Sequence, residues 1–313
     1  MAARMIRILC RVALVLWVAS ASGGELLRIS PRPGSEAAGL NVAHPDLPGN
    51  IFDFRTCEAV LDGNRDFGLF RVKLALPGAQ GVAAWSTNDG SFRYQWIYPE
   101  GITVQFRATA ETRRVALAYT VVNRTAAPLE RVHLHTCVTT TEAPRFFPRL
   151  TPRLESQLPA NSPDKDYTEL LTRLFLWKGG QSFTLDNTEH RRRQVHLALL
   201  PQGEAPIEWA WWINSTNTFD EPLIALASRD GQWTAGLWFE RAAWASSNAG
   251  DDRACFHLFP FFGRIEPGTS ATVRGAFHLL RASPEELRQR THRRSEQNRN
   301  QPSENSPLSN EGK

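Results

Sequence analysis

The sequence predicts an all-β fold: a large antiparallel β-sandwich or supersandwich with a short C-terminal helix and a disordered tail. Apolar Val115, Leu117, Tyr119 and Val121 alternate with other residues, which is the period of a strand with one buried face. Short runs of this kind recur over residues 51–280 with turn residues between them, as in a sandwich. Amphipathic helical periodicity is scarce, which also favours the all-β fold.

The expected strands follow one another at short intervals, separated by clusters of Gly, Pro, Asn and Asp. They cover residues 69–76, 102–110, 115–121, 129–139, 195–200, 207–213, 223–228, 233–244, 254–260 and 271–280. Asp230-Gly231 predicts a tight hairpin between two of them. Asp166 to Phe175 fits either a short helix or a strand.

The segments outside the 51–280 sandwich domain have different compositions. Residues 22–50 are rich in Gly and Pro and predict an extended lead-in. Ser283-Pro284-Glu285-Glu286 has the pattern of an N-cap followed by Pro and acidic residues, so a short helix is expected over residues 281–293. Residues 294–313 contain almost no apolar side chains and predict a disordered tail.

The first 21 residues predict a secretory signal peptide. Three arginines precede the apolar run Val12–Val18, and Ala19-Ser20-Ala21 then places small residues at a cleavage site. The apolar run is much shorter than the ~20 residues that span a bilayer, so no membrane span is expected after cleavage. A secreted, periplasmic or other extracytoplasmic location follows.

Charge and cysteine content narrow the function classes. Most of the excess positive charge lies in the leader and in the last 33 residues, so the domain itself is nearly neutral and nucleic acid is not an expected partner. Beyond the leader the chain keeps Cys57, Cys137 and Cys255, too few for a disulfide framework. One bridge with a leftover thiol and three buried thiols are both compatible with this set.

Strand phase indicates a polar face. In residues 129–139, alternation places Arg131, His133, His135 and Cys137 on one face, opposite apolar residues. The strand over residues 254–260 repeats this arrangement, with Arg253, Cys255 and His257 opposite apolar residues. Two strands thus present the same residue types on one face, which would suit a polar ligand.

These histidines allow three interpretations. They are ordinary hydrogen-bonded histidines, acid–base groups acting on a sugar, or zinc ligands. The weak catalytic candidates are His133, His135, Glu240 and His257. The predicted ligand-binding set adds an exposed tryptophan to the polar face; it comprises Arg131, His133, His135, Trp212, Arg253 and His257.

Cys137 and Cys255 admit further alternatives if their strands are neighbours. The two sulfurs would then bridge, or His135, Cys137, Cys255 and His257 would form a soft-metal quartet. Two unrelated buried thiols are the remaining alternative.

Glu240, in an aromatic strand, is either paired with a neighbouring arginine or functional. The primary expectation is no metal and no cofactor.

The run VALAYTVVNRTAAPLERVHLH, with the closing run IEPGTSATVRGAFHLL, resembles galactose-mutarotase-like β-supersandwich proteins over about residues 60 to 280. The resemblance implies a sugar-binding fold, with His133 or His135 matching a sugar-contacting histidine and Glu240 a late base. The segment TCVTTTEAPRFF departs from the aromatic-Phe-Asn segment that follows this histidine in mutarotases.

The sequence therefore predicts an exported carbohydrate-binding β-sandwich protein. One alternative is a sugar-modifying enzyme, such as a mutarotase or epimerase, a lyase or a hydrolase, using His and Glu as acid–base groups. The other is a non-catalytic structural module of the envelope.

Overall fold

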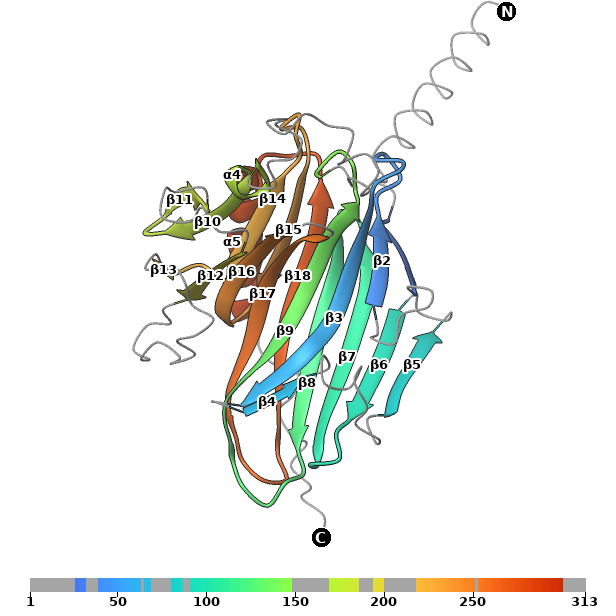
Figure 1. Ribbon diagram of the computed structural model, residues 1–313, viewed down its shortest axis with the longest axis vertical. Coiled ribbons are helices and arrows are strands. Elements are labelled where there is room, and N and C mark those ends of the chain that lie inside the picture. Colours follow the sequence, from blue (N-terminus) through green and yellow to red (C-terminus); the bar gives the residue numbers. More distant parts are fainter. Residues whose placement is uncertain are drawn as a thin grey trace, which may run out of the picture.

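The computed structural model describes residues 26–31, 39–62, 65–68, 80–86, 91–147, 169–185, 194–199, 218–250 and 253–300. These residues form two stacked sheets that are almost wholly antiparallel, which confirms the predicted sandwich (Figure 1). No helix within these ranges is both long and apolar enough to cross a membrane. The expected strands over residues 69–76 and 207–213 lie outside the described residues.

The first sheet is built around its three longest strands, which lie side by side. In order across the sheet its strands are β1 (Arg28–Pro31), β2 (Gly39–Ala43), β3 (Ile51–Asp62), β9 (Leu129–Glu142), β17 (Arg253–Ile265), β16 (Ala242–Gly250), β12 (Gln194–Leu199) and β13 (Thr218–Phe219), with β4 (Arg65–Gly68) also paired to β3. The pair β12 and β13 is parallel.

The second sheet contains the hairpins that the alternating pattern predicted. Its order is β11 (Gln181–Thr184), β10 (Leu174–Lys178), β14 (Leu223–Ala227), β15 (Thr234–Phe239), β18 (Ser270–Leu280), β8 (Arg114–Asn123), β7 (Ile102–Glu111), β6 (Ser91–Ile97) and β5 (Gln80–Ser86). Gly231, at φ 68°, makes the tight turn between β14 and β15, as Asp230-Gly231 predicted.

Three boundaries differ from the prediction. The lead-in contains β1 and β2, because Leu40 and Val42, on either side of Asn41, point to the same face and pack into the core. The expected strand over residues 233–244 is two strands, β15 and β16, in different sheets, because the polar pair Glu240-Arg241 interrupts it. Residues 166–175 contain both predicted alternatives, the short helix α4 (Glu169–Thr172) and the start of β10.

Helix α5 (Pro284–Asn300) covers part of the second sheet and extends past the predicted end at residue 293 into the expected disordered tail. Its start has the predicted cap: the Ser283 hydroxyl accepts a hydrogen bond from the Glu286 amide at 3.2 Å, and the Glu286 carboxylate accepts one from the Ser283 amide at 2.7 Å. Leu287 is fully buried and packs against β14 and β15.

The main core fills the space between the sheets with alternate side chains from both. Aromatic rings from opposite sheets meet there, as where Phe52 of β3 lies 5.5 Å from Phe277 of β18. Because each strand gives one face to this core, the other face of each sheet carries the remaining side chains. We call these the outer faces of the first and second sheets.

Candidate functional site

Strand β9 crosses the middle of the first sheet, between β3 and β17. Val132, Leu134 and Val138 lie in the core between the sheets. Alternation therefore places His133 and His135 on the outer face, as the sequence predicted.

Strand β17 repeats this phase beside β9. Ala254, Phe256 and Leu258 face the core, so Cys255 and His257 share the outer face with the β9 histidines. Cys255 lies opposite Thr139 of β9 in the antiparallel register. The structure thus makes neighbours of the two strands whose polar residues the sequence grouped only by type.

A bulge in β3 adds two residues that the sequence reasoning missed. Arg55 pairs with Cys137 and Ala59 with His135, so the register shifts between them and brings Glu58 beside Arg55. The guanidinium Nη1 of Arg55 donates a 2.9 Å hydrogen bond to Glu58 Oε1.

The bulge is held from the core side. The Tyr119 hydroxyl, from the second sheet, donates a 2.6 Å hydrogen bond to the backbone carbonyl of Thr56. This bond ties the bulge to the second sheet across the core.

Six ionisable side chains from β3, β9 and β17 now form one group, which we call the histidine cluster. Its members are Arg55, Glu58, His135, Cys137, Cys255 and His257. All six are at most 9% exposed.

Contacts inside the cluster fix the imidazole rings. His257 Nδ1 lies 2.9 Å from the Ser246 hydroxyl of β16, which leaves Nε2 as the ring nitrogen available to the cluster. His135 Nε2 lies 3.8 Å from Glu58 Oε2, and the centroids of the His135 and His257 rings are 4.8 Å apart. Ser246 was also missed by the sequence reasoning.

Aromatic rings flank the cluster on one side. Phe259 stacks on His135 with ring centroids 4.6 Å apart and planes 7° apart. Trp244 of β16 stacks on His133 at 5.7 Å. These rings belong to a small apolar cluster that also contains Ala59, Leu61, Ala243 and Phe261.

His133 belongs to this apolar patch. It is fully buried, and its Nδ1 lies 3.0 Å from the Arg131 carbonyl. Burial lowers the pKa of His133 to about 4, so the imidazole is neutral at pH 7 and its Nδ1–H donates to that carbonyl.

The two cysteines of the cluster are hydrogen-bonded to each other, and this bond shifts their pKa values in opposite directions. It lowers the pKa of Cys255 and, together with burial, raises the pKa of Cys137. Burial lowers the pKa of His257, but the neighbouring Cys255 outweighs burial and raises it. Cys255 and His257 thus favour each other's charged form.

Cys57, Cys137 and Cys255 are all buried free thiols, so the alternative of a Cys137–Cys255 bridge is not what the structure contains. Cys57 lies in the main core rather than on the outer face.

The remaining predicted residues are dispersed. Arg131 is half-buried on β9 at φ 53°. Glu240 follows β15 on the second sheet, away from the histidines, and its Oε1 lies 3.9 Å from Arg274 Nη1, which is the structural pairing considered for it. Trp212 and the side chain of Arg253 lie outside the described part of the chain.

The sequence matches no protein-family model and no curated protein sequence. Among solved structures it matches galactose-mutarotase-like proteins and a glycosidase, at low sequence identity.

Three of these matches illustrate the range. A galactose mutarotase related enzyme from Lactobacillus acidophilus is 9% identical, with TM-score 0.41; the match covers 82% of this chain and 99% of that one. The Slr1438 protein from Synechocystis is 9% identical, with TM-score 0.41 and coverage of 83% and 98%. The alpha-N-acetylgalactosaminidase NagBb from Bifidobacterium bifidum is 11% identical, with TM-score 0.49; the match covers 88% of this chain but only 39% of that one. Similarity at this level says nothing about a ligand.

Proposed function

We propose that this protein is an exported carbohydrate-binding protein whose ligand contacts the histidine cluster of the first sheet. The observation that carries the proposal is the cluster itself: Arg55, Glu58, His135 and His257 converge from three adjacent strands on one face. The export part rests on the signal-peptide pattern of the first 21 residues.

Stability alone does not account for the cluster. Burying a guanidinium, a carboxylate and two imidazoles carries a desolvation penalty that a well-packed apolar set would avoid. The sandwich already has an extensive apolar core between its sheets. Ionisable groups with shifted pKa values concentrate at functional sites, and Cys255 and His257 are such groups here.

The chemistry of the cluster suits sugar hydroxyls, each of which both donates and accepts a hydrogen bond. A guanidinium such as that of Arg55 only donates, a carboxylate only accepts, and an imidazole donates or accepts at each nitrogen according to its protonation. Phe259 and Trp244, which are 3% and 2% exposed, form an apolar wall beside these groups.

Direct binding tests the proposal. The exported protein is screened on a glycan array, and the best ligand is titrated against wild type, Glu58→Gln and His135→Ala. We expect both substitutions to weaken binding about tenfold or more, because each removes a hydrogen-bonding group from the cluster. His292→Ala, a half-exposed histidine of α5, is the matched control and should leave binding unchanged.

Glu58→Gln keeps the size of the side chain, so it separates loss of binding from loss of folding, which the melting temperature reports for each variant. A folded wild-type protein that retains no glycan would overturn the proposal, as would full affinity in both variants. Turnover of aldoses or acidic polysaccharides by wild type would assign the cluster to a sugar-modifying enzyme instead.

Metal binding is a second candidate function, favoured by one specific observation. Ligand atoms of Cys137, Cys255 and His257 all lie within 4.8 Å of one another, as do those of Glu58, His135 and His257. Two thiolates and an imidazole suit zinc, and either Glu58 or His135 would supply a fourth ligand.

Elemental analysis distinguishes the two candidates. Protein purified without chelator is measured for zinc and for reactive thiols, with Cys137→Ser and Cys255→Ser as variants and Cys57→Ser as the matched control. One zinc per chain, lost in the first two variants and kept in the control, would favour the metal. A metal-free chain with free thiols would rule out the metal and leave carbohydrate binding as the remaining candidate.

A further inference from the structure

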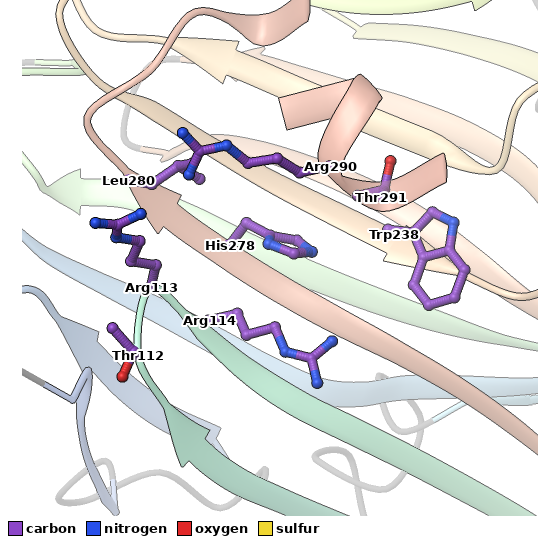
Figure 2. A pocket seen from close by; sticks show the side chains of 8 residues that line it. All are labelled: Thr112, Arg113, Arg114, Trp238, His278, Leu280, Arg290 and Thr291. Carbon is purple, nitrogen blue, oxygen red and sulfur yellow. The ribbon is translucent and has the colours of Figure 1, made fainter. Parts of the chain in front are cut away.

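A basic hollow lies on the outer face of the second sheet, opposite in the sandwich to the histidine cluster (Figure 2). It has a volume of about 160 Å³. It is lined by residues of the β7–β8 turn, β8, β15, β18 and α5: Thr112, Arg113, Arg114, Trp238, His278, Leu280, Arg290 and Thr291.

The sheet register and the helix together build this hollow. His278 of β18 lies directly opposite Arg114 of β8, so their side chains are neighbours on the outer face. Leu287 packs α5 onto Gly236 of β15, which brings Arg290 over the same face. Figure 2 shows His278 between Arg290 and Arg114, with Trp238 beyond it below the helix.

A second, larger hollow of about 630 Å³ adjoins the first, because Arg113 and Arg290 line both. Arg145, Arg281 and Trp233 lie among its walls. Together the two hollows form a continuous basic recess, which we call the arginine recess.

Carboxylates of the protein neutralise only part of this charge. Glu111 holds Arg114 through two hydrogen bonds of 2.6 and 2.8 Å, and Asp230 binds Arg145 at 2.5 Å. Glu286, one helical turn before Arg290, acts on it electrostatically but is hydrogen-bonded to Ser283, and Asp46 lines the larger hollow.

Three guanidinium groups therefore lack a direct salt bridge. Within the described part of the chain, Arg113, Arg281 and Arg290 lie within 4.0 Å of no carboxylate oxygen. Arg290 is nevertheless close enough to Glu286 to add to the effect of the Ser283 hydrogen bonds, which lower the pKa of that carboxyl. The three guanidinium groups come from a β-turn, the end of a strand and a helix, so their gathering at one recess is a property of the tertiary fold. A convergence of such groups favours an anion, above all a planar or tetrahedral oxyanion that accepts two hydrogen bonds.

We propose that the arginine recess binds an acidic saccharide, with a carboxylate or sulfate group between Arg113 and Arg290 and a sugar ring against Trp238. The indole at one end provides an aromatic surface for the ring. The adjoining larger hollow gives room for the next residues of a chain. This site is separate from the histidine cluster and does not depend on the function proposed there.

Titration of the full-length exported protein tests this site. The probes are an oligogalacturonate, a heparin-derived oligosaccharide and neutral cello-oligosaccharide. The test variant is the double substitution Arg113→Asn/Arg290→Gln, since Asn tolerates the positive φ of 69° at position 113. The matched control, Arg124→Gln/Arg274→Gln, removes the same charge from exposed positions elsewhere.

We expect at least one acidic probe to bind wild type and the control equally, and the test variant about tenfold or more weakly. The carboxylated and sulfated probes separate the two sources of negative charge. Trp238→Leu should weaken the saccharide but not inorganic sulfate.

Two results would overturn the inference: no acidic probe binds the folded wild type, or both double variants lose the same affinity. Equal binding of the acidic probe by Trp238→Leu and wild type would also overturn it, because the site would then be one for a simple anion. The Glu58→Gln variant distinguishes the sites, since it should leave binding at the arginine recess unchanged.

Discussion

The outer faces of the two sheets both carry arginine and histidine, but in different surroundings. On the first sheet Arg55, Glu58 and the histidines are at most 9% exposed and contact one another or aromatic rings. On the second sheet Arg274 is 69% exposed, and Arg113 and Arg290 line open hollows. Hydrogen bonds within a buried group therefore organise the first face, whereas charge exposed to solvent dominates the second.

This difference implies different energetics for the same kind of substitution. On the first face a change removes packing or leaves a buried group without its partner. On the second face water replaces whatever is lost, so that stability changes little and ligand binding changes more. The predictions below test this contrast from the largest expected effect to the smallest.

Trp244→Ala, on the first face, should destabilise the protein by about 3–5 kcal/mol, because the indole is 2% exposed and its removal leaves a cavity beside His133. Trp238→Ala, on the partly exposed second face, should lower the free energy of unfolding by less than half as much as Trp244→Ala. Chemical denaturation measures both. Equal losses would contradict the contrast between the faces.

Acid should destabilise the protein through His133. Its pKa is about 4 in the folded protein against 6.5 unfolded, so the unfolded chain binds the proton first. The contribution of neutral His133 to the free energy of unfolding is complete above pH 6.5. It declines as pH falls toward 4, by up to about 1.4 kcal/mol per pH unit. The rings of Trp244 and Phe259 pack against the imidazole, and Arg131 is the charged group that acts on it and disfavours its protonation.

His133→Phe keeps the aromatic volume and should flatten the free energy of unfolding between pH 6.5 and 4. Ser270→Ala, at an exposed strand start and without a titratable group, is the control and should keep the wild-type slope. A wild-type slope in His133→Phe would show that His133 is not the titrating group.

Gly236→Ala should move α5 away from the second sheet. A Cβ at this position would lie 2.4 Å from Leu287 Cδ2 and 3.2 Å from the Ile224 carbonyl oxygen. We expect a loss of about 1–3 kcal/mol from overpacking, together with weaker binding at the arginine recess. Ser270→Ala, at an exposed strand start, is the control and should leave both stability and binding unchanged.

Asp230→Asn should have the smallest effect, below about 1 kcal/mol, because the ion pair with Arg145 is one-third exposed and screened. The Ser228 hydroxyl, together with Arg145, lowers the pKa of Asp230 to about 2. Its contribution is therefore present above pH 3.8 and is lost as pH falls toward 2. Unfolding curves measure this loss. The difference in free energy of unfolding between variant and wild type should be smaller at pH 2 than at pH 7.

Local periodicity predicted much of the fold. The alternation in residues 115–121 and the phase of His133, His135, Cys255 and His257 follow from side chains pointing to opposite faces of a strand. The pairing of β9 with β17, more than 100 residues apart, does not follow from local pattern. It depends on the topology of the whole sandwich.

Irregular features account for what sequence reasoning missed at the site. The bulge in β3 moves Glu58 beside Arg55, and a bulge leaves no period to detect. The alternation of Phe52 and Phe54 with Asp53 and Arg55 was a detectable signal for a strand with a charged outer face. The arginine recess combines several turns and strands with a helix, so no single segment indicates it.

The most direct test of the central claim observes the cluster itself as a sugar binds. Imidazole ¹⁵N resonances of His135 and His257 can be followed during titration with the best array glycan, with His292 as the internal reference. We predict saturable shifts at His135 and His257 whose midpoint moves to about tenfold higher ligand concentration or more in Glu58→Gln, and no shift at His292. Saturable binding that leaves both cluster histidines unshifted would contradict the claim that the ligand contacts this face.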